Sequence, residues 1–499
     1  MGRRLKIFFT SDIHGHLFPT SYRDAKQRPL GLHQLQRLFQ KDENTLIIDG
    51  GDSLQGSPLT YLCHDEDDPE WIAEKMNEAG YDYVTLGNHD FNYGLPYLKR
   101  YADALDAKVL CQNVTDEQGR CLFPYTIHLL PNGWRVGLVG AVTDSVNIWE
   151  RKEHLVGCQV LDVRQELEKV AQTLKAQCDL TICIYHGGYE GDLERLERSE
   201  SGRENIGIEL CREMDFDVLL CCHQHMLTPG RSLFGTYTLQ NAPNAATCFE
   251  IDICEQDSGE GHSISSTLHH LSDLAALPLS PLSEADAERF SRLQAWLDRP
   301  IGHLPEALRP EDRVEMARHG SKLADFINEI QRAYLQTELS CTSFANDIPG
   351  LPQDVRIRDL LLTYPFPNTL VALDVTGKVL KAALERSAEY LSYSEASGAL
   401  EVSKHFLEPK VEHYNFDFFL GIKAQIDWSA PFGERVRAIY RGEKEVSPED
   451  HYSLAMNNYR ASGAGGYAFY QDCAVLKRDA RDVFDVLCDY FLQQKAQDL

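Results

Sequence analysis

Five times in the first half of the chain, an apolar segment typical of a β-strand stops at Asp, Asn or His residues. Together these clusters contain seven potential metal ligands: Asp12, His14, Asp52, Asn88, His186, His223 and His225. Carboxylate, amide and imidazole groups without thiolate suit hard to borderline divalent ions. The pairs Asp12/His14 and His223/His225 are each two residues apart, and in an extended chain the members of such a pair point the same way.

With Asp52 shared, the seven groups would give each of two ions four protein ligands. Ligands at the carboxyl ends of strands lie where open α/β sheets build their sites. Two ions about 3.5–4 Å apart can hold one hydroxide, lower the pKa of that water toward ~7, and clamp the attacking and leaving oxygens. The pattern therefore predicts a two-metal hydrolytic site.

Taken singly, an Asp or His at a strand end is more often a cap or a surface residue, so the prediction depends on all five clusters occurring together. Asp49 lies three residues before Asp52, and we expect it to hydrogen-bond the loop rather than to bind metal. We expect His16 and Asp90 to support the imidazoles that bind metal, because such ligands usually have a polar partner behind them.

The elements that must position these side chains alternate between β-rich and helix-like segments up to about Ile253, which indicates α/β layering. The segment SPLSEADAERFSRLQAWL has a Ser cap and helical spacing of apolar residues, which predicts a connecting helix. A second α/β unit follows. We predict a catalytic domain over 1–275, a linker helix within 276–300 and a second domain over 301–499.

The composition limits location and partners. The chain has 499 residues and a net charge of −27, which disfavours long nucleic acids as partners but not a small anion at a metal site. No apolar run reaches the ~18 residues of a membrane helix, and the apolar stretch near the start is too short for a signal peptide. Fourteen scattered cysteines favour reduced thiols. We expect a cytoplasmic protein that does not engage membranes, and the oligomeric state stays open.

The motifs SDIHGH, GGDSLQGSP, GNHDFNYG, YHGG and CHQH make the chain resemble the calcineurin-like metallophosphoesterases, specifically their 5′-nucleotidase group. The resemblance implies an α/β fold: a four-layer β-sandwich flanked by helices, followed by a smaller α/β nucleotidase C-terminal domain. It also implies two divalent ions, of Mn, Zn, Co or Mg. One ion would be bound by Asp12, His14, Asp52 and His225, and the other by Asp52, Asn88, His186 and His223. His89 would act in catalysis by stabilising the departing oxygen.

Two segments of the second half, TYPFPNTL and NNYRASGAGGY, resemble the signatures of that C-terminal domain. The resemblance implies that Phe366 and Tyr459 sandwich the base of a nucleotide and that Asn368 hydrogen-bonds the nucleoside. A base stacked on aromatic rings gains roughly 1–3 kcal/mol whichever base it is, so broad base preference would follow. The alternative is that both aromatics belong to the core, but the adjacent Pro and Gly residues favour loops.

Three positions and one segment depart from the pattern of plain 5′-nucleotidases. Asn92 and Gly465 stand where those enzymes have aspartates, Cys222 replaces a glycine, and residues 343–352 lack the substrate-binding arginine. Asn92 and the tyrosine in NNYRASG resemble instead the 2′,3′-cyclic nucleotide 2′-phosphodiesterase/3′-nucleotidase branch.

The sequence therefore predicts a dinuclear-metal hydrolase of nucleoside monophosphates, 2′,3′-cyclic nucleotides or both, acting through a metal-bound hydroxide. One alternative keeps the metal pair but changes the substrate to a nucleotide-sugar, a dinucleotide or another small phosphate ester. A second alternative, motivated by Asn92, Cys222 and the missing arginine, is a nucleotide-binding regulatory protein with a degenerate site.

Overall fold

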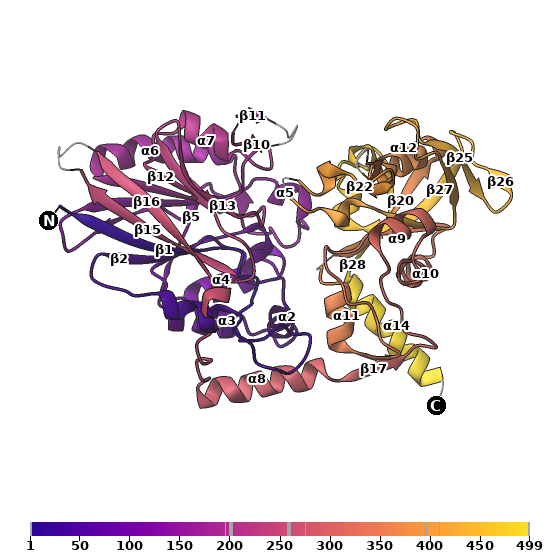
Figure 1. Cartoon of the computed structure of the whole chain (residues 1–499), viewed down its shortest axis with the longest axis horizontal. Helices are drawn as coiled ribbons and strands as arrows, with labels where there is room; N and C mark the ends of the chain where they lie inside the picture. Colours follow the sequence, from indigo (N-terminus) through magenta and orange to yellow (C-terminus); the bar gives the residue numbers. More distant parts are fainter. Residues whose placement is uncertain are drawn as a thin grey trace. The chain divides into compact units, whose positions relative to one another are not determined.

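A computed structural model describes residues 2–194, 196–198, 203–256, 261–274, 276–366, 368–394, 397–408 and 410–497. The chain forms two units, Met1–Leu293 and Gln294–Leu499. The predicted connecting helix is present as α8 (Glu284–Leu297), which crosses the boundary between them (Figure 1). Near its start, the hydroxyl of Ser283 accepts the backbone N–H of Asp286 at 3.1 Å, as the sequence pattern predicts for a Ser cap.

The first unit is built on two β-sheets. One sheet has the strand order β16 (His262–His270), β15 (Thr247–Glu255), β1 (Arg4–Thr10), β2 (Thr45–Asp49), β3 (Tyr83–Thr85), β4 (Lys108–Thr115) and β5 (Cys121–Phe123), with β8 (Gln159–Val160) paired to β4. The other has the order β13 (Thr228–Leu233), β14 (Thr236–Gln240), β12 (Val218–Cys221), β9 (Leu180–His186), β7 (Arg135–Val142) and β6 (Thr126–Leu129). The central strands are parallel in both sheets, β1 to β4 in the first and β7, β9, β12 and β14 in the second.

The main core of this unit lies between the two sheets. Alternate residues of β1, namely Leu5, Ile7 and Phe9, are buried against side chains of the second sheet such as Ile182 and Leu220. This alternation follows from the two-residue period of a strand, which sends every second side chain to the same face.

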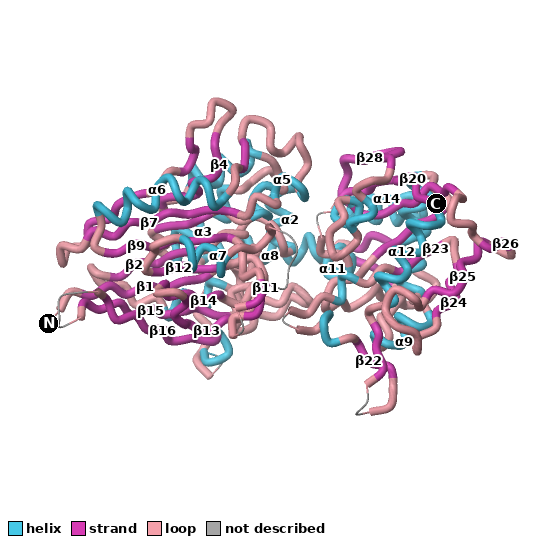
Figure 2. The backbone as a smooth tube through the Cα atoms, turned by 90° about the horizontal axis from the view of Figure 1, so that it is seen from above, coloured by secondary structure: helices cyan, strands magenta, loops and turns pink. Residues whose placement is uncertain are grey.

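Helices connect the parallel strands. In the first unit these are α1 (Leu32–Leu35), α2 (Pro58–Asp65), α3 (Glu70–Ala79), α4 (Leu95–Ala104), α5 (Val146–Trp149), α6 (Val163–Gln177) and α7 (Gly207–Glu213). Helix α6 runs beside β7 (Figure 2) and, with α7, packs on the face of the second sheet that is turned away from the first. The predicted α/β class and the sandwich flanked by helices are confirmed.

The second unit is a smaller α/β structure. Its main sheet has the order β23 (Phe418–Leu420), β18 (Leu339–Thr342), β27 (His451–Asn457), β20 (Thr369–Thr376) and β28 (Ala474–Asp482). Two further small sheets contain β17 (Pro300–His303) with β19 (Asp354–Arg356), and β24 (Lys423–Ile426) with β25 (Val436–Arg441) and β26 (Lys444–Glu445). A hairpin pairs β21 (Leu391–Tyr393) with β22 (Leu400–Val402). The helices are α9 (Arg313–His319), α10 (Lys322–Leu335), α11 (Ile357–Thr363), α12 (Gly377–Ala388), α13 (Asn458–Ala461) and α14 (Val483–Gln497).

A buried ion pair holds the glycine-rich loop of the second unit, residues 463–466. The guanidinium of Arg460 lies 2.9 Å from a carboxylate oxygen of Asp417, and each side chain is 2% exposed. Arg460 also donates to the backbone oxygens of Tyr414 and Ala464 at 2.8 and 2.7 Å. Because these bonds use the arginine's donors inside the fold, Arg460 fixes the loop rather than facing solvent.

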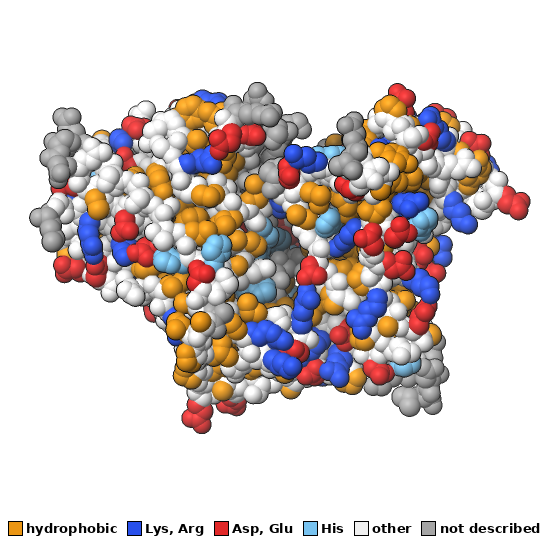
Figure 3. Space-filling model, viewed as in Figure 1, with side chains coloured by type: hydrophobic (Ala, Val, Ile, Leu, Met, Phe, Trp, Pro, Cys, Tyr) orange, Lys and Arg blue, Asp and Glu red, His pale blue; other side chains and the backbone are white. Residues whose placement is uncertain are grey.

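The surface carries charges of both signs. On the face drawn in Figure 3, basic and acidic side chains are intermingled over each unit. Among the residues that the structure describes, none of the helices has the length and apolarity that crossing a membrane requires.

Candidate metal centre

All seven predicted ligands lie at or just after the carboxyl end of a strand in the first unit. Asp12 and His14 follow β1, Asp52 follows β2 and Asn88 follows β3. In the second sheet, His186 ends β9, and His223 and His225 follow β12. Because both sheets present these ends at one edge of the sandwich, residues more than 200 positions apart meet there.

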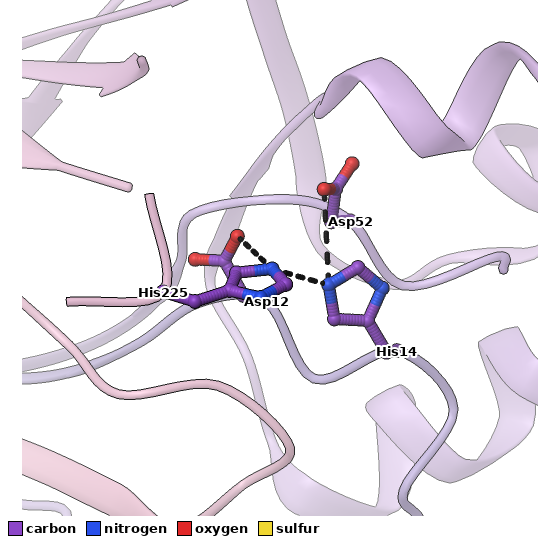
Figure 4. Close-up of side chains that lie close together, drawn as sticks. All are labelled: Asp12, His14, Asp52 and His225. Carbon is purple, nitrogen blue, oxygen red and sulfur yellow. Dashed lines mark hydrogen bonds and ion pairs between the residues drawn. The ribbon is translucent and has the colours of Figure 1, made fainter. Parts of the chain in front are cut away.

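The first group contains Asp12, His14, Asp52 and His225, and one ligand atom of each lies within 4.8 Å of the others (Figure 4). The Nε2 atoms of His14 and His225 are 2.9 Å apart. His225 Nε2 is 3.6 Å from a carboxylate oxygen of Asp12, and His14 Nε2 is 3.9 Å from one of Asp52. Three of the four side chains are buried and His225 is partly open, so the group has access from solvent on one side.

The second group contains Asp52, His186 and His223, again with ligand atoms within 4.8 Å of one another. His186 Nε2 is 3.1 Å from Asp52 Oδ2. The amide of Asn88 joins this group, since its Oδ1 lies 2.8 Å from His223 Nδ1. Asp52 belongs to both groups, as the sequence predicts.

The donor atoms fit a cation. His14 Nδ1 lies 2.7 Å from the backbone oxygen of Gln55, and His186 Nδ1 lies 2.6 Å from that of Gly50. A carbonyl only accepts, so each Nδ1 must carry a proton, and Nε2 is the nitrogen that can offer a lone pair to a cation. His186 Nε2 and Asp52 Oδ2 are both buried and neither has a hydrogen bond of acceptable geometry among the described residues. Lone pairs that face one another in this way are stabilised by a cation between them.

The electrostatics of the metal-free site lead to the same conclusion. Burial alone would lower the pKa of His186, but the carboxylates of Asp52 and Asp12 raise it well above its ordinary value. Burial alone would raise the pKa of Asp52, but the imidazoles of His186 and His89 hold it well below its ordinary range. The carboxylates of the cluster thus favour positive charge nearby, and bound divalent ions would supply that charge.

The backbone that presents the ligands is not extended, so our reason for pairing them was wrong. Asp12 and His14 have φ of 53° and 52°, and His223 and His225 have φ of 76° and 57°, all in the left-handed region. The bend at Asp12 and His14 is held by two backbone hydrogen bonds, from Asp12 N to Gly51 O (2.9 Å) and from His14 N to Asp52 O (2.8 Å). Left-handed residues other than glycine are strained and gather at functional sites. The members of each pair converge because the loop after β1 and the loop after β12 are bent, not because of the two-residue period of a strand.

Asp90 has a different role from the one predicted. Its carboxylate accepts the backbone N–H groups of Asp52, Ser53, Leu54 and Gly87 at 2.8–3.0 Å. It therefore shapes the Asp52 loop and does not support an imidazole. Position 87 must be a glycine, because a Cβ there would lie 2.1 Å from Asp52 Oδ1.

Asp49 and His16 also pack within the fold. Asp49 accepts the N–H of Gly51 at 3.0 Å, the loop contact that we predicted, and burial raises its pKa to about 8. His16 packs edge-on against Tyr22 with ring centres 5.4 Å apart.

His89 lies beside the first metal-ligand group. Its ring centre is 5.4 Å from that of His14, and its backbone N–H donates to Asp52 Oδ1 at 2.7 Å. Its Nδ1 is 2.8 Å from Oδ1 of Asn92. The imidazole is thus held beside the predicted ligands, and its role in catalysis stays a prediction.

Two contacts to His223 were missed by the sequence reasoning. A carboxylate oxygen of Glu204 lies 2.9 Å from His223 Nε2, and the ring of Trp149 stacks on the imidazole at 5.5 Å between centres. A carboxylate behind an imidazole ligand orients the ring and makes it more basic. Both residues come from connecting segments, where no strand pattern marks them.

Cys222 is accommodated in the core. Its side chain is fully buried between the two sheets, and burial raises its pKa to about 12. A Cβ on Gly50 would lie 2.3 Å from the sulfur. Gly50, whose carbonyl orients His186, therefore provides the space that the larger residue needs.

The three predicted substrate-binding residues lie near one corner of the second unit. Phe366 and Asn368 precede β20, Tyr459 follows β27, and these strands are paired at Leu370 and Asn457. The N–H of Thr369 donates to the side chain of Asn458 at 2.9 Å, which ties the two segments together. Phe366 and Tyr459 are both half-buried. Nucleotide binding by these residues stays a prediction.

Two family models match the chain: calcineurin-like phosphoesterase over residues 5–227 and 5′-nucleotidase, C-terminal domain, over residues 300–472. A candidate 5′-nucleotidase from Staphylococcus aureus, solved with alpha-ketoglutarate, is 30% identical with a TM-score of 0.91, covering 98% of this chain and 96% of that one.

Among curated proteins, a 2′,3′-cyclic-nucleotide 2′-phosphodiesterase/3′-nucleotidase of Salmonella typhimurium is 23% identical over 92% of this chain and 81% of its own length. A trifunctional nucleotide phosphoesterase protein of Bacillus subtilis is 24% identical over 98% of this chain. The chain spans 38% of the length of that Bacillus protein.

Proposed function

This chain belongs to the calcineurin-like phosphoesterases that carry a 5′-nucleotidase C-terminal domain, and we propose that it hydrolyses nucleotide phosphoesters. The predicted family and the class of metal-dependent phosphoric ester hydrolase are confirmed. The substrates that we propose are nucleoside monophosphates, 2′,3′-cyclic nucleotides, or both. The observation that carries the proposal is the convergence of two metal-ligand groups on one shared carboxylate, Asp52.

We propose two divalent ions at this site. Asp12, His14 and His225 would bind one, Asn88, His186 and His223 would bind the other, and Asp52 would bridge them. When bound, such ions supply Lewis acidity and lower the pKa of water toward ~7, which provides a nucleophile at neutral pH. Imidazole, carboxylate and amide ligands suit Mn, Zn, Co or Mg.

The chain's own residues orient the reacting groups. The carbonyls of Gln55 and Gly50 fix the tautomers of His14 and His186. His89 would donate a proton or hydrogen bond to the departing oxygen, since it adjoins the ligands without belonging to them.

In the second unit, we propose that Phe366 and Tyr459 stack on the base and that Asn368 binds the nucleoside. Tyr459→Ala should lower kcat/KM for nucleotides roughly 5- to 150-fold, the equivalent of 1–3 kcal/mol of stacking. Turnover of a simple aryl phosphate, which has no base, should be unchanged. Steady-state kinetics on both substrates measures this difference.

Tyr393→Ala provides the matched control, since Tyr393 is an exposed tyrosine of the same unit. It should leave both substrates unaffected. Equal losses on the nucleotide and the aryl phosphate in Tyr459→Ala would refute a role in base binding.

A substrate screen tests the proposed activity. Purified protein with Mn²⁺ should release phosphate from 3′- or 5′-nucleotides or open 2′,3′-cyclic nucleotides, and EDTA should abolish this activity. The match to the Salmonella enzyme and Asn92 favour the cyclic and 3′-esters. Turnover confined to nucleotide-sugars or non-nucleotide esters would contradict the proposal. Tight nucleotide binding without turnover across several metals would indicate a regulatory protein.

The predicted cytoplasmic location remains a proposal as well. It is supported by the cysteines, since all fourteen lie in the described residues and all are free. Reduced thiols are typical of the cytosol.

A further inference from the structure

A chain of hydrogen bonds extends from His89 into a segment that the proposed reaction does not use. His89 Nδ1 lies 2.8 Å from Asn92 Oδ1, and Asn92 Nδ2 donates to Glu150 Oε2 at 2.7 Å. The other oxygen of Glu150 accepts from Nδ1 of His154 at 2.8 Å and from the N–H of Arg151 at 2.7 Å. The Glu150 side chain is only 7% exposed.

Glu150 fixes which way the Asn92 amide points. A carboxylate only accepts hydrogen bonds, so the amide must present its NH₂ group to Glu150 and its oxygen to His89. With the amide reversed, its oxygen would face a carboxylate oxygen and its NH₂ would face His89. The position of Asn92 alone leaves both orientations open, and Glu150 selects one of them.

The selected amide orientation fixes the tautomer of His89. Because Asn92 Oδ1 accepts, His89 Nδ1 must donate, which leaves Nε2 as the ring nitrogen that takes up the proton and gives it to the departing oxygen. The reversed amide would require the proton on Nε2 instead. The carboxylate thus determines, through one amide, which ring nitrogen is free.

The backbone holds Glu150 in place independently of its side chain. The N–H of Glu150 donates to Val146 O at 2.8 Å, and the N–H of Leu95 in α4 donates to His154 O at 3.1 Å. The preceding residue, Trp149, stacks on His223. One short segment, from α5 to His154, therefore contacts both the predicted metal ligand His223 and the chain of hydrogen bonds that leads to His89.

We propose that Glu150 is a positioning residue for the phosphoesterase reaction, acting through Asn92 to fix the tautomer and direction of His89. It also places a negative charge one side chain behind His89. The proposal rests on the proposed function for its kinetic consequence, but not for the tautomer itself.

The isosteric change Glu150→Gln tests the proposal. A glutamine can present either its oxygen or its NH₂ group to Asn92, so the amide is no longer held in one orientation. We expect kcat to fall about 10- to 100-fold, the usual effect of losing a group that orients an active-site side chain. KM and bound metal should be unchanged. Glu153→Gln, at an exposed carboxylate of the same segment, is the matched control and should retain the parent kcat.

The background Asn92→Asp separates positioning from a general structural role. A carboxylate at position 92 accepts from His89 without help and would repel Glu150. In that background, Glu150→Gln should therefore leave kcat unchanged or raise it. A similar loss in both backgrounds would overturn the proposal.

A readout that needs no turnover is the nitrogen NMR spectrum of histidine-labelled, metal-free protein. The His89 signals are identified by their loss in His89→Ala. They should show a protonated Nδ1 in the parent and a changed tautomer in Glu150→Gln. An unchanged tautomer would overturn the proposal even if the protein hydrolysed every substrate expected of it. Absence of nucleotide turnover with the expected tautomer change would refute the proposed function instead.

Discussion

Asp52→Asn is expected to remove nearly all activity. Asp52 is 1% exposed, belongs to both metal-ligand groups and has its Oδ2 atom 3.1 Å from His186 Nε2. The amide has the same shape but lacks the charge that would hold two cations together. We expect kcat/KM to fall at least about 10³-fold, because both the nucleophile and the stabilised leaving group depend on those cations.

Metal analysis of the purified variant measures the cause directly. The bound divalent ion should fall below that of the parent, while circular dichroism should show the same fold. Asp103→Asn, at an exposed carboxylate of the same unit, should change neither quantity. Parent-level activity and metal content in Asp52→Asn would exclude the bridging role.

His89→Ala is expected to lower kcat about 10²- to 10³-fold, the usual loss when a group that stabilises developing charge is removed. The backbone N–H of residue 89, which donates to Asp52 at 2.7 Å, is kept in the variant. Bound metal should therefore stay at the parent level, in contrast to Asp52→Asn. Rate measurements over a range of substrate concentrations separate kcat from KM.

Leaving-group dependence gives a further check. If His89 assists the departing oxygen, the loss should shrink with esters whose leaving groups need no such help, such as nitrophenyl phosphate. His270→Gln, at an exposed histidine, should retain full turnover. Full turnover in His89→Ala would leave the proposed role without support.

The segment before α6 carries more of the site than its sequence suggested. Trp149 and Glu150 come from a short helix and the turn after it, yet they contact His223 and Asn92. Short connecting segments have no periodicity that predicts their partners. Their contacts are set by where the two sheets place them.

The sequence by itself determined the α/β layering, the strand ends that carry ligands and the identity of the seven converging groups. It could do so because apolar segments mark the strands, and the carboxyl ends of parallel strands lie at one edge of a sheet. It did not determine the left-handed turns at Asp12, His14, His223 and His225, the work of Asp90 on the Asp52 loop, or the carboxylates of Glu204 and Glu150. Those features arise from hydrogen bonds between segments far apart in the chain. Such bonds form only once the two sheets have packed together and brought these polar groups out of water.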